Sequence, residues 1–217
     1  MKKPELVLVA GCNAAGKSTF IRTRLNELEG FEILMTDVYK GRTNELARRA
    51  ISQGKDILIE TVFNDESFKD LADEARNAGY QTSLVVLFLD NIQQSVNRVA
   101  FRGVQQNGIT ISGSNIKINF NESFKNIARY FFYFDRTDFI YTGEGEVNKL
   151  IMNFQKSELV VYHSTDLIYP KKFAEYSFQS ERLNEGAYQV IISNKNFKSK
   201  CLKSQSGLPG SNYNFPL

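Results

Sequence analysis

The stretch Gly11-Cys12-Asn13-Ala14-Ala15-Gly16-Lys17-Ser18 decides the fold, because it fits the pattern GxxxxGK followed by Ser or Thr. It comes directly after a continuous apolar run at residues 6–10, and a helical pattern begins at its lysine. A strand that leads through such a loop into a helix is the context in which this pattern binds phosphate. The alternative, a glycine-rich turn without a ligand, does not explain the lysine and the serine. The stretch therefore predicts a phosphate-binding loop.

Each residue type in the loop has a physical role. Gly11 and Gly16 allow backbone conformations and close approaches that a side chain would block. Successive backbone N–H groups can then surround phosphate oxygens, beside the positive end of the helix dipole. Lys17 is expected to add a charge at the β- and γ-phosphates, and the Ser18 hydroxyl to coordinate Mg²⁺. Cys12 is expected to be a small loop residue, with a reactive thiol as the alternative.

Outward from the loop, short apolar runs alternate with helical patterns. The pattern predicts strands at residues 6–10, 31–35, 56–59, 83–89 and 139–141, and helices at residues 17–29, 44–53, 65–77 and 92–105. This alternation predicts βαβ units, and so a P-loop NTPase-type α/β fold whose parallel sheet has helices on both faces. Ligands of such sheets bind at the carboxyl ends of the strands. Gly11, Asp37 and Glu60 fall at or just after strand ends and are expected to line one crevice.

The rest of the chain is predicted to extend this core. Residues 106–121, rich in Asn, Gly, Ser and Ile, predict a loop or lid segment. Farther along, the pattern predicts a β-hairpin at 149–154 and 157–163, a helix at 171–183, a strand at 188–192 and an irregular tail at 204–217. We therefore expect a P-loop kinase-like domain at residues 1–165 and a C-terminal extension at residues 166–217.

The composition excludes several kinds of site and partner. Among 217 residues His163 is the one histidine, which excludes zinc sites built from several histidines. Two cysteines, Cys12 and Cys201, exclude a four-cysteine metal site and a disulfide framework. A formal net charge of +3 is too small to indicate nucleic acid or a membrane surface. The run before Gly11 is too short for a signal peptide, and no run nears the ~20 residues of a membrane helix. A cytoplasmic protein without nucleic-acid or membrane partners is expected.

Phosphate binding alone does not identify the reaction. A switch GTPase would show an NKxD motif, but Asn194-Lys195-Asn196 lacks the acid. An AAA-type ATPase would end a strand in paired acids, whereas the strands at 56–59 and 83–89 are followed by the single acids Glu60 and Asp90. The pattern that is left is a kinase that transfers phosphate to a second small substrate.

Four residues are candidates for the chemistry of transfer. Asp37 is placed to accept the proton of an acceptor hydroxyl, although a helix N-cap or loop acid is an equally good interpretation. Glu60, beside Thr61, would bind the acceptor or hold a magnesium-bound water, or be a simple strand-end acid. Arg98 and Arg102 lie one helical turn apart and are candidate lid arginines that neutralise charge in the transition state. The alternative for both is an exposed basic helix face, which is the more common outcome.

Five motifs, in order, resemble the zeta-toxin family of P-loop kinases. They are the loop at residues 10–20, MTD at 35–37, ILIETV at 57–62, ARNAGYQTSLVVLFL at 75–89 and RVAFR at 98–102. The resemblance covers about residues 5–163. It implies a toxin-type kinase that uses ATP and Mg²⁺ to phosphorylate a hydroxyl of a UDP-linked amino sugar, with an antitoxin protein as a further candidate partner.

The resemblance also implies roles for individual residues. ATP would be bound by Gly11, Cys12, Asn13, Ala14, Ala15, Gly16, Lys17, Ser18 and Thr19, with Mg²⁺ on Ser18. Asp37 would be the base, and Glu60 with Thr61 would contact the acceptor. Arg98 and Arg102 would contact ATP or the transferred phosphoryl group.

The segment after Arg102 departs from the family. Where the family has G-G-H-x-V-P, residues 107–112 read NGITIS, so Ile109 replaces the histidine and Ser112 the proline. Asn119 stands where an I-x-x-R-Y segment has its arginine. Either the acceptor differs from the usual one or transfer is weakened, and Lys117 is a candidate to replace the lost charge.

Other functions stay open on the residues alone. One is a nucleotide-binding regulatory or interaction protein, or a weak ATPase, that phosphorylates no acceptor. The altered lid segment and the long tail favour this alternative somewhat. Another is a nucleoside or polynucleotide kinase, although no basic and aromatic stretch indicates a nucleic-acid acceptor.

Overall fold

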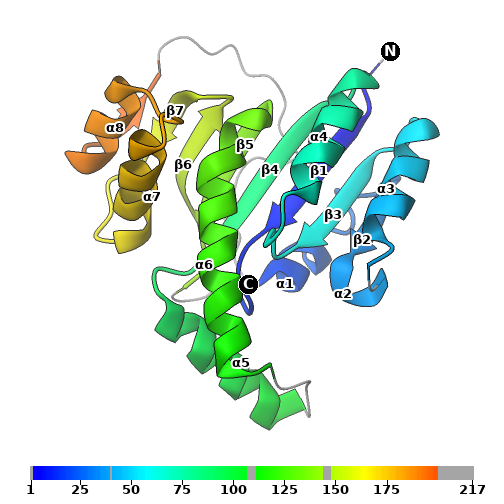
Figure 1. Cartoon of the computed structure of the whole chain (residues 1–217), viewed down its shortest axis with the longest axis horizontal. Coiled ribbons are helices and arrows are strands. Elements are labelled where there is room, and N and C mark those ends of the chain that lie inside the picture. Colours follow the sequence, from blue (N-terminus) through cyan, green and yellow to red (C-terminus); the bar gives the residue numbers. More distant parts are fainter. Residues whose placement is uncertain (1, 40, 107–110, 144–147, 200–217) are drawn as a thin grey trace.

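One mixed sheet of eight strands organises the part of the chain that the structure describes (Figure 1). This structure is a computed structural model, and it describes residues 2–39, 41–106, 111–143 and 148–199. The strands are β1 (Glu5–Ala10), β2 (Glu32–Met35), β3 (Ile57–Thr61), β4 (Gln81–Phe88), β5 (Arg136–Tyr141), β6 (Lys149–Gln155), β7 (Glu158–Tyr162) and β8 (Phe197–Lys198). Their order is β2-β3-β1-β4-β5-β6-β7-β8, parallel up to β5 and antiparallel from there. The predicted parallel core with a β-hairpin is confirmed, and the hairpin continues the same sheet.

Helices cover both faces of this sheet. They are α1 (Lys17–Arg22), α2 (Thr36–Tyr39), α3 (Thr43–Ser52), α4 (Ser67–Asn77), α5 (Ile92–Gln106), α6 (Gly113–Tyr130), the 3₁₀ helix η1 (Phe131–Tyr133), α7 (Ile168–Gln179) and α8 (Glu185–Ile192). The helix predicted at residues 17–29 is shorter in the structure: α1 ends at Arg22, and turns follow up to Gly30. α4 and α6 pack on one face of the sheet and α1 packs on the other.

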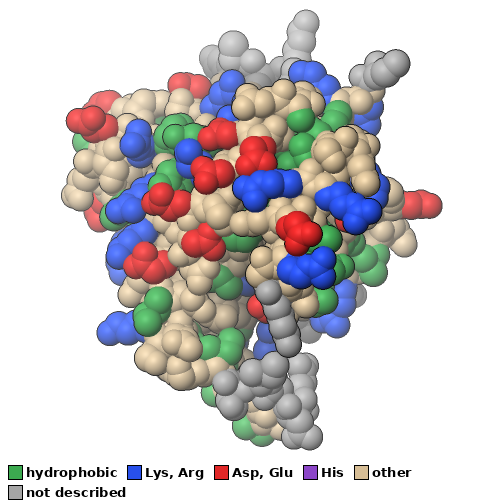
Figure 2. Space-filling model, turned by 45° about the vertical axis from the view of Figure 1, so that its right-hand side comes forward, with side chains coloured by type: hydrophobic (Ala, Val, Ile, Leu, Met, Phe, Trp, Pro, Cys, Tyr) green, Lys and Arg blue, Asp and Glu red, His purple; other side chains and the backbone are tan. Residues whose placement is uncertain are grey.

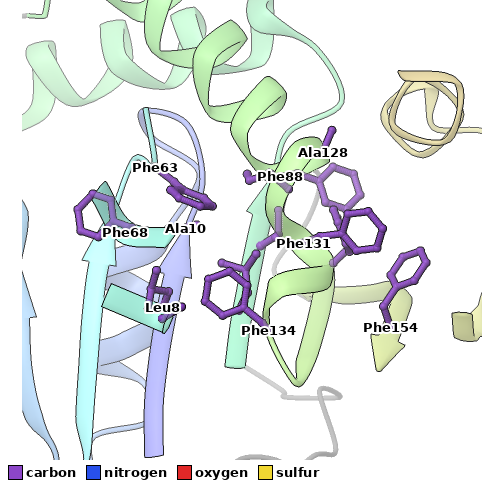
Figure 3. Close-up of a cluster of buried hydrophobic side chains, with 14 of the residues drawn as sticks. Leu8, Ala10, Phe63, Phe68, Phe88, Ala128, Phe131, Phe134 and Phe154 are labelled. Carbon is purple, nitrogen blue, oxygen red and sulfur yellow. The ribbon is translucent and has the colours of Figure 1, made fainter. Parts of the chain in front are cut away.

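The continuous apolar run of β1 is explained by burial on both faces of the sheet. Leu6 and Leu8 belong to the buried cluster that also holds side chains of α4 and α6. Val7 and Val9, which alternate with them, belong to the cluster that includes Phe20 of α1. Figure 3 shows part of the first cluster, in which Leu8 lies among phenylalanine side chains from several elements. Such double-sided burial is typical of central strands in parallel sheets.

The predicted loop at residues 106–121 is wrong for its second half. α6 begins at Gly113, after the Ser112 hydroxyl accepts a 3.3 Å hydrogen bond from the Asn115 N–H. Ile116 and Ile127 are buried along this helix, and Ile127 belongs to the cluster that contains strand residues, so burial outweighs the loop-like composition. Residues 107–110, which include Ile109, lie outside the described residues.

The predicted strand at residues 188–192 is also wrong, because these residues form the end of α8. Asn184 begins the helix by accepting a 2.8 Å hydrogen bond from the Ala187 N–H. Tyr188 stacks on Phe178 of α7, with ring centroids 4.3 Å apart. The predicted tail at 204–217 lies outside the described residues.

The described part of the C-terminal extension packs on the same sheet. Phe173 of α7 and Ile191 of α8 are fully buried in the cluster that contains Leu8. β8 pairs with β7 through Tyr162 and Phe197. Residues 166–199 therefore share a core with the strands that carry the loop.

The carboxyl ends of β2, β3 and β1 lie side by side, and this places the site. Met35 at the end of β2 pairs with Glu60 of β3, and Val9 of β1 pairs with the same Glu60 on its other side. Ala10 pairs with Thr61 just before the loop begins. This register brings Glu60 and the start of α2, with Asp37, beside the loop, whereas Gly11 does not line the cavity that these two acids share.

The face shown in Figure 2 carries side chains of both charges. In Figure 2, Lys and Arg side chains are interspersed with Asp and Glu side chains. Within the described ranges, no helix is long and apolar enough to cross a membrane.

Candidate functional site

The loop after β1 requires glycine at two positions. A Cβ on Gly11 would lie 2.1 Å from the Leu87 carbonyl oxygen of β4, so a side chain cannot be accommodated there. Gly16 starts α1 with a φ of 87°, a left-handed conformation that side chains disfavour. Ala14 also has a positive φ, of 58°. The loop is thus folded as the glycine pattern predicts.

Five successive carbonyl groups of the loop, those of residues 11–15, accept hydrogen bonds from side chains. The donors are Lys17 Nζ to residues 11 and 12 (3.0 and 3.1 Å), Ser95 Oγ to 13 (2.7 Å), Arg98 Nη1 to 14 (3.3 Å) and Thr142 Oγ1 to 15 (2.8 Å). The N–H and C=O groups of a peptide plane point in opposite directions. Holding these carbonyls therefore fixes the peptide planes of the loop, and with them the directions of its N–H groups.

A cavity of about 240 Å³ lies beside the loop. Its lining includes Asn13, Lys17, Ser18, Asp37, Glu60 and Arg102. The structure thus brings together these six predicted candidates, from the loop and the start of α1, β3, α2 and α5. A cavity of about 940 Å³ at the beginnings of β4 and β5 is larger, but none of the predicted site residues lines it.

Lys17 and Glu60 form the buried charged centre of this cavity. Lys17 is only 8% exposed to solvent and Glu60 only 7%. Burial lowers the pKa of Lys17, and the negative charge of Glu60 opposes that shift. Burial likewise raises the pKa of Glu60, with Lys17 opposing it. Each charge is therefore costly to bury and is partly compensated by the other.

Ser18 and Glu60 offer oxygen atoms that fit a magnesium ion. The Ser18 hydroxyl donates to Glu60 Oε1 at 3.1 Å, whereas Glu60 Oε2 is buried and has no hydrogen-bond partner among the described residues. Hydroxyl and carboxylate oxygens suit Mg²⁺, which usually keeps waters and phosphate oxygens as its other ligands. The unpartnered oxygen next to the loop serine is where such an ion, or a water bound to it, would satisfy the carboxylate.

Asp37 and Arg102 face this cavity without partners of their own. Asp37 is exposed in the first turn of α2, inside the helix rather than before it, and lines both this cavity and a neighbouring one of about 370 Å³. Arg102 is exposed on α5 and lines the first cavity. Neither side chain makes a hydrogen bond or ion pair with a described residue. Both side chains are free to meet a ligand.

Arg98 lies behind the loop rather than in the cavity. Its guanidinium group donates to the Ala14 carbonyl and to the carbonyls of Thr142 and Gly143, which follow β5. It is not among the residues that line the cavity, so the expected contact with phosphate is not formed in this arrangement. Arg98 instead connects the loop to the end of β5.

Two other predicted site residues, Cys12 and Thr61, have surroundings that indicate a structural role. Cys12 is buried, and burial raises the pKa of its thiol, which disfavours a reactive thiolate. Thr61 Oγ1 accepts a 2.9 Å hydrogen bond from the N–H of Phe63, whose φ of 57° turns the chain sharply away from β3. Thr61 lines the neighbouring cavity.

The lid position occupied by Asn119 carries a bridge of amides. Asn119 Nδ2 donates to Asn13 Oδ1 of the loop at 2.9 Å, and Asn64 Nδ2 donates to Asn119 Oδ1 at 3.0 Å. Lys117 lies elsewhere on α6, in a groove with Tyr176 outside both cavities, so it does not replace the missing arginine charge.

Sequence reasoning missed several residues of this site. Ser95 precedes Arg98 by one helical turn, and that spacing could have indicated a shared face toward the loop. Thr142 directly follows a predicted strand end, where ligand-side residues gather. The amide bridge through Asn64 has no local signal, because its members lie far apart in the sequence.

Comparisons with known proteins identify a family from the sequence and a shared fold from solved structures. The sequence model of the zeta toxin family matches residues 40–165, more than half of the chain and entirely after the phosphate-binding loop. A comparison with curated proteins finds no match. One similar solved structure is of the PezAT chromosomal toxin–antitoxin system of the human pathogen Streptococcus pneumoniae. At 14% identity, the match covers 89% of this chain and 86% of that one, with a TM-score of 0.53.

Two similar structures are of AvrRxo1-ORF1:ORF2. The one with ATP has 11% identity, a TM-score of 0.58 and coverage of 89% of this chain and 77% of that one. The one with sulphate ions has 12% identity, a TM-score of 0.56 and coverage of 90% and 78%. At such identities the likeness concerns the fold.

Proposed function

The chain belongs to the zeta-toxin family, and we propose that it is a kinase that transfers the γ-phosphoryl group of ATP to a hydroxyl group of a small molecule. The observation that carries the proposal is the position of Asp37, which lines both the phosphate cavity and the neighbouring cavity. A phosphoryl donor in one cavity and an acceptor in the other would meet at this carboxylate. The family and the fold shared with an ATP-containing structure support a P-loop phosphotransferase.

The loop and its lysine would hold the triphosphate. Backbone N–H groups of the loop, whose peptide planes are held by the hydrogen-bonded carbonyls, would bind phosphate oxygens, and the buried Lys17 would add positive charge. Ser18 and Glu60 would hold Mg²⁺, directly or through water. When bound, the ion supplies further neutralisation of the phosphate charge.

Asp37 would act as the base of the transfer step. The acceptor oxygen forms a bond to the γ-phosphorus while the bond from that phosphorus to the β–γ bridging oxygen breaks, and ADP leaves. The proton of the acceptor hydroxyl passes to the Asp37 carboxylate, which has no hydrogen-bond partner among the described residues. Because this carboxylate is exposed at the junction of the cavities, both the acceptor and solvent can reach it.

The two arginines would have different roles. Arg102, which lines the phosphate cavity, would neutralise charge on the transferred group. Arg98 would act as a positioning residue, since its guanidinium already holds the Ala14 carbonyl. Ser95 and Thr142 would assist Arg98 in fixing the loop.

The acceptor implied by the family resemblance is a UDP-linked amino sugar. Incubation of the full chain with ATP, Mg²⁺ and a panel of nucleotide sugars, sugars and nucleosides, read by mass spectrometry, tests the function. A mass increase of one phosphoryl group on a panel member, lost in Asp37→Asn, is the expected result. ADP formation with no phosphorylated acceptor would instead support a weak ATPase or a nucleotide-binding regulatory protein. Phosphorylation of nucleosides alone would favour a nucleoside kinase.

We also propose a protein partner and a reducing compartment. One solved structure with this fold is of a toxin–antitoxin system, which supports an antitoxin-like partner for this chain. Cys12 is a free, buried cysteine, which is consistent with the cytoplasm. Purification of the tagged chain from its native cells, followed by identification of stoichiometric partners, tests the first proposal.

A further inference from the structure

The neighbouring cavity of about 370 Å³ carries information about the acceptor. It shares Asn13, Thr36 and Asp37 with the phosphate cavity and extends to the beginnings of α3 and α4. Asn119 lies at its wall and connects to the loop through Asn13. Since Asp37 stands where the cavities meet, an acceptor that gives its proton to Asp37 would occupy this space.

Two buried polar atoms of this wall lack hydrogen-bond partners among the described residues. They are Thr43 Oγ1 and Asn44 Oδ1, both from the first turn of α3. Thr43 is only 3% exposed. Buried polar atoms are normally hydrogen-bonded, so unsatisfied atoms in a cavity wall indicate groups that a ligand or water completes.

The orientation of the Asn44 amide is fixed by its neighbours. Asn44 Nδ2 donates to Ser67 Oγ at 2.9 Å, and Ser67 Oγ in turn donates to Asp65 Oδ1. The single hydroxyl proton of Ser67 is therefore committed to Asp65, and only the nitrogen of Asn44 can face Ser67. The other atom of the amide is an oxygen, which accepts but cannot donate. Asn44, which lines the cavity, thus carries an unsatisfied acceptor that a donor such as a hydroxyl group would complete.

The charge of the cavity opposes an anionic acceptor. Among the described residues that line it, the charged side chains are Asp37 and Asp65. Lys17 and Arg102 line the phosphate cavity and not this one. A diphosphate here would stand near two carboxylates without a counter-charge from the described wall, which is unfavourable.

The beginnings of α3 and α4 do not reverse this balance. The Ser67 N–H, at the start of α4, already donates to Asp65 Oδ1 at 2.9 Å. α3 carries Glu45 in its first turn, which offsets the positive end of its dipole.

Resting on the proposed function, we propose that the acceptor is a polyhydroxyl compound without negative charge, bound with one of its hydroxyl groups donating to Asn44. The diphosphate of a UDP-linked sugar does not match this cavity. The altered lid position agrees with an acceptor that lacks negative charge. There Asn119 contributes a neutral amide, whereas an anionic acceptor would be served by a cationic guanidinium.

Binding is measured separately from transfer, by calorimetry on the full chain saturated with ADP and Mg²⁺. The probes are compared with counterparts that carry negative charge. N-acetylglucosamine and glucosamine are compared with UDP-N-acetylglucosamine, and uridine is compared with uridine monophosphate. At least one uncharged or cationic probe is expected to bind about tenfold or more tightly than its anionic counterpart. Equal or tighter binding of the anionic counterparts, or binding of none of the uncharged and cationic probes, overturns the proposal.

Variants locate the preference in this wall. Asn44→Ala is expected to weaken binding of the tightest-binding probe about fivefold or more. Asn121→Ala, on an exposed part of α6, is expected to leave that affinity unchanged. Asp65→Asn keeps an acceptor for the Ser67 N–H but removes a negative charge. It should therefore reduce the difference in affinity between uncharged and anionic probes. An unchanged difference, or an unchanged affinity in Asn44→Ala, contradicts the assignment. Should Asn44→Ala fail to fold, the near-isosteric Thr43→Val is expected to weaken the same probe.

The two proposals fail in different ways. If the charge preference is found but no probe is phosphorylated, the kinase function is wrong and the cavity assignment stands. If a nucleotide sugar is phosphorylated and binds more tightly than the free sugar, the kinase function stands and the acceptor class is wrong.

Discussion

The hydroxyl of Ser18 lies 3.1 Å from Oε1 of Glu60, so the last residue of the loop pattern is tied to the end of β3. The second carboxylate oxygen of Glu60 is buried and unpartnered among the described residues. Glu60→Gln should therefore weaken Mg²⁺ use, raising the Mg²⁺ concentration needed for half-maximal transfer roughly 10- to 100-fold. Titration of activity with Mg²⁺ measures this. ADP affinity in EDTA should match the wild type, and an unaltered Mg²⁺ dependence would contradict the assignment.

The same carboxylate predicts a pH dependence of stability. Burial raises the pKa of Glu60 above its unfolded value of about 4.3, so the folded state holds this proton more firmly. Stability contributed by the protonated form is present below the unfolded pKa and is lost as pH rises through the folded pKa. In nucleotide-free protein, wild type should therefore lose more stability than Glu60→Gln as pH rises above about 4.3. Urea unfolding of both proteins at several pH values measures the difference, and parallel curves would contradict it.

Gly11 should tolerate no side chain. A Cβ would meet the Leu87 carbonyl oxygen at 2.1 Å, and neither backbone can move without disturbing the β1–β4 pairing. Gly11→Ala is expected to cost about 3 kcal/mol or more, through overpacking. Gly54→Ala is the matched control, since Gly54 also has positive φ but nothing within 4 Å of a Cβ, and should cost about 1–2 kcal/mol. Thermal unfolding compares them, and equal losses would show that the close approach is unimportant.

Local sequence signals account for the loop and the central strands. The loop pattern specifies backbone conformation residue by residue, and the apolar run of β1 reflects burial on both faces. The site that forms where β1, β2 and β3 end could therefore be predicted, because parallel strands bring their carboxyl ends to one edge.

Tertiary contacts explain what could not be predicted. Residues 113–121 have the composition of a loop, yet Ile116 and Ile127 bury one side of α6 and make it helical. Residues 188–192 are rich in β-branched residues, but the Asn184 cap and the stacking of Tyr188 on Phe178 favour a helix. The bond of Asn119 to Asn13 joins residues 106 positions apart, so no local pattern could reveal it.

Replacing either of the two arginines of α5 should impair a different property of the protein: nucleotide binding and stability for Arg98, and kcat for Arg102. Arg98 fixes the Ala14 carbonyl, so Arg98→Ala should weaken ADP binding about 10- to 150-fold, which corresponds to the ~1.5–3 kcal/mol of a charged hydrogen bond, and lower the melting temperature. The Arg102 side chain lines the cavity and has no partner among the described residues, so Arg102→Ala should lower kcat about 10²- to 10³-fold while largely sparing ADP affinity and stability. Calorimetry, thermal unfolding and steady-state kinetics separate these effects. The reverse pattern would exchange the two assignments.

Asp37 is the residue on which the proposed transfer depends, because it alone among the described carboxylates lines both cavities. Asp37→Asn keeps its size but cannot take the acceptor proton, so phosphotransfer should fall about 10²- to 10⁴-fold with ADP affinity and melting temperature unchanged. Asp70→Asn, an exposed acid on α4 far along the chain from the loop, is the matched control and should transfer as the wild type does. Full phosphotransfer by Asp37→Asn would mean that another group, or water, accepts the proton.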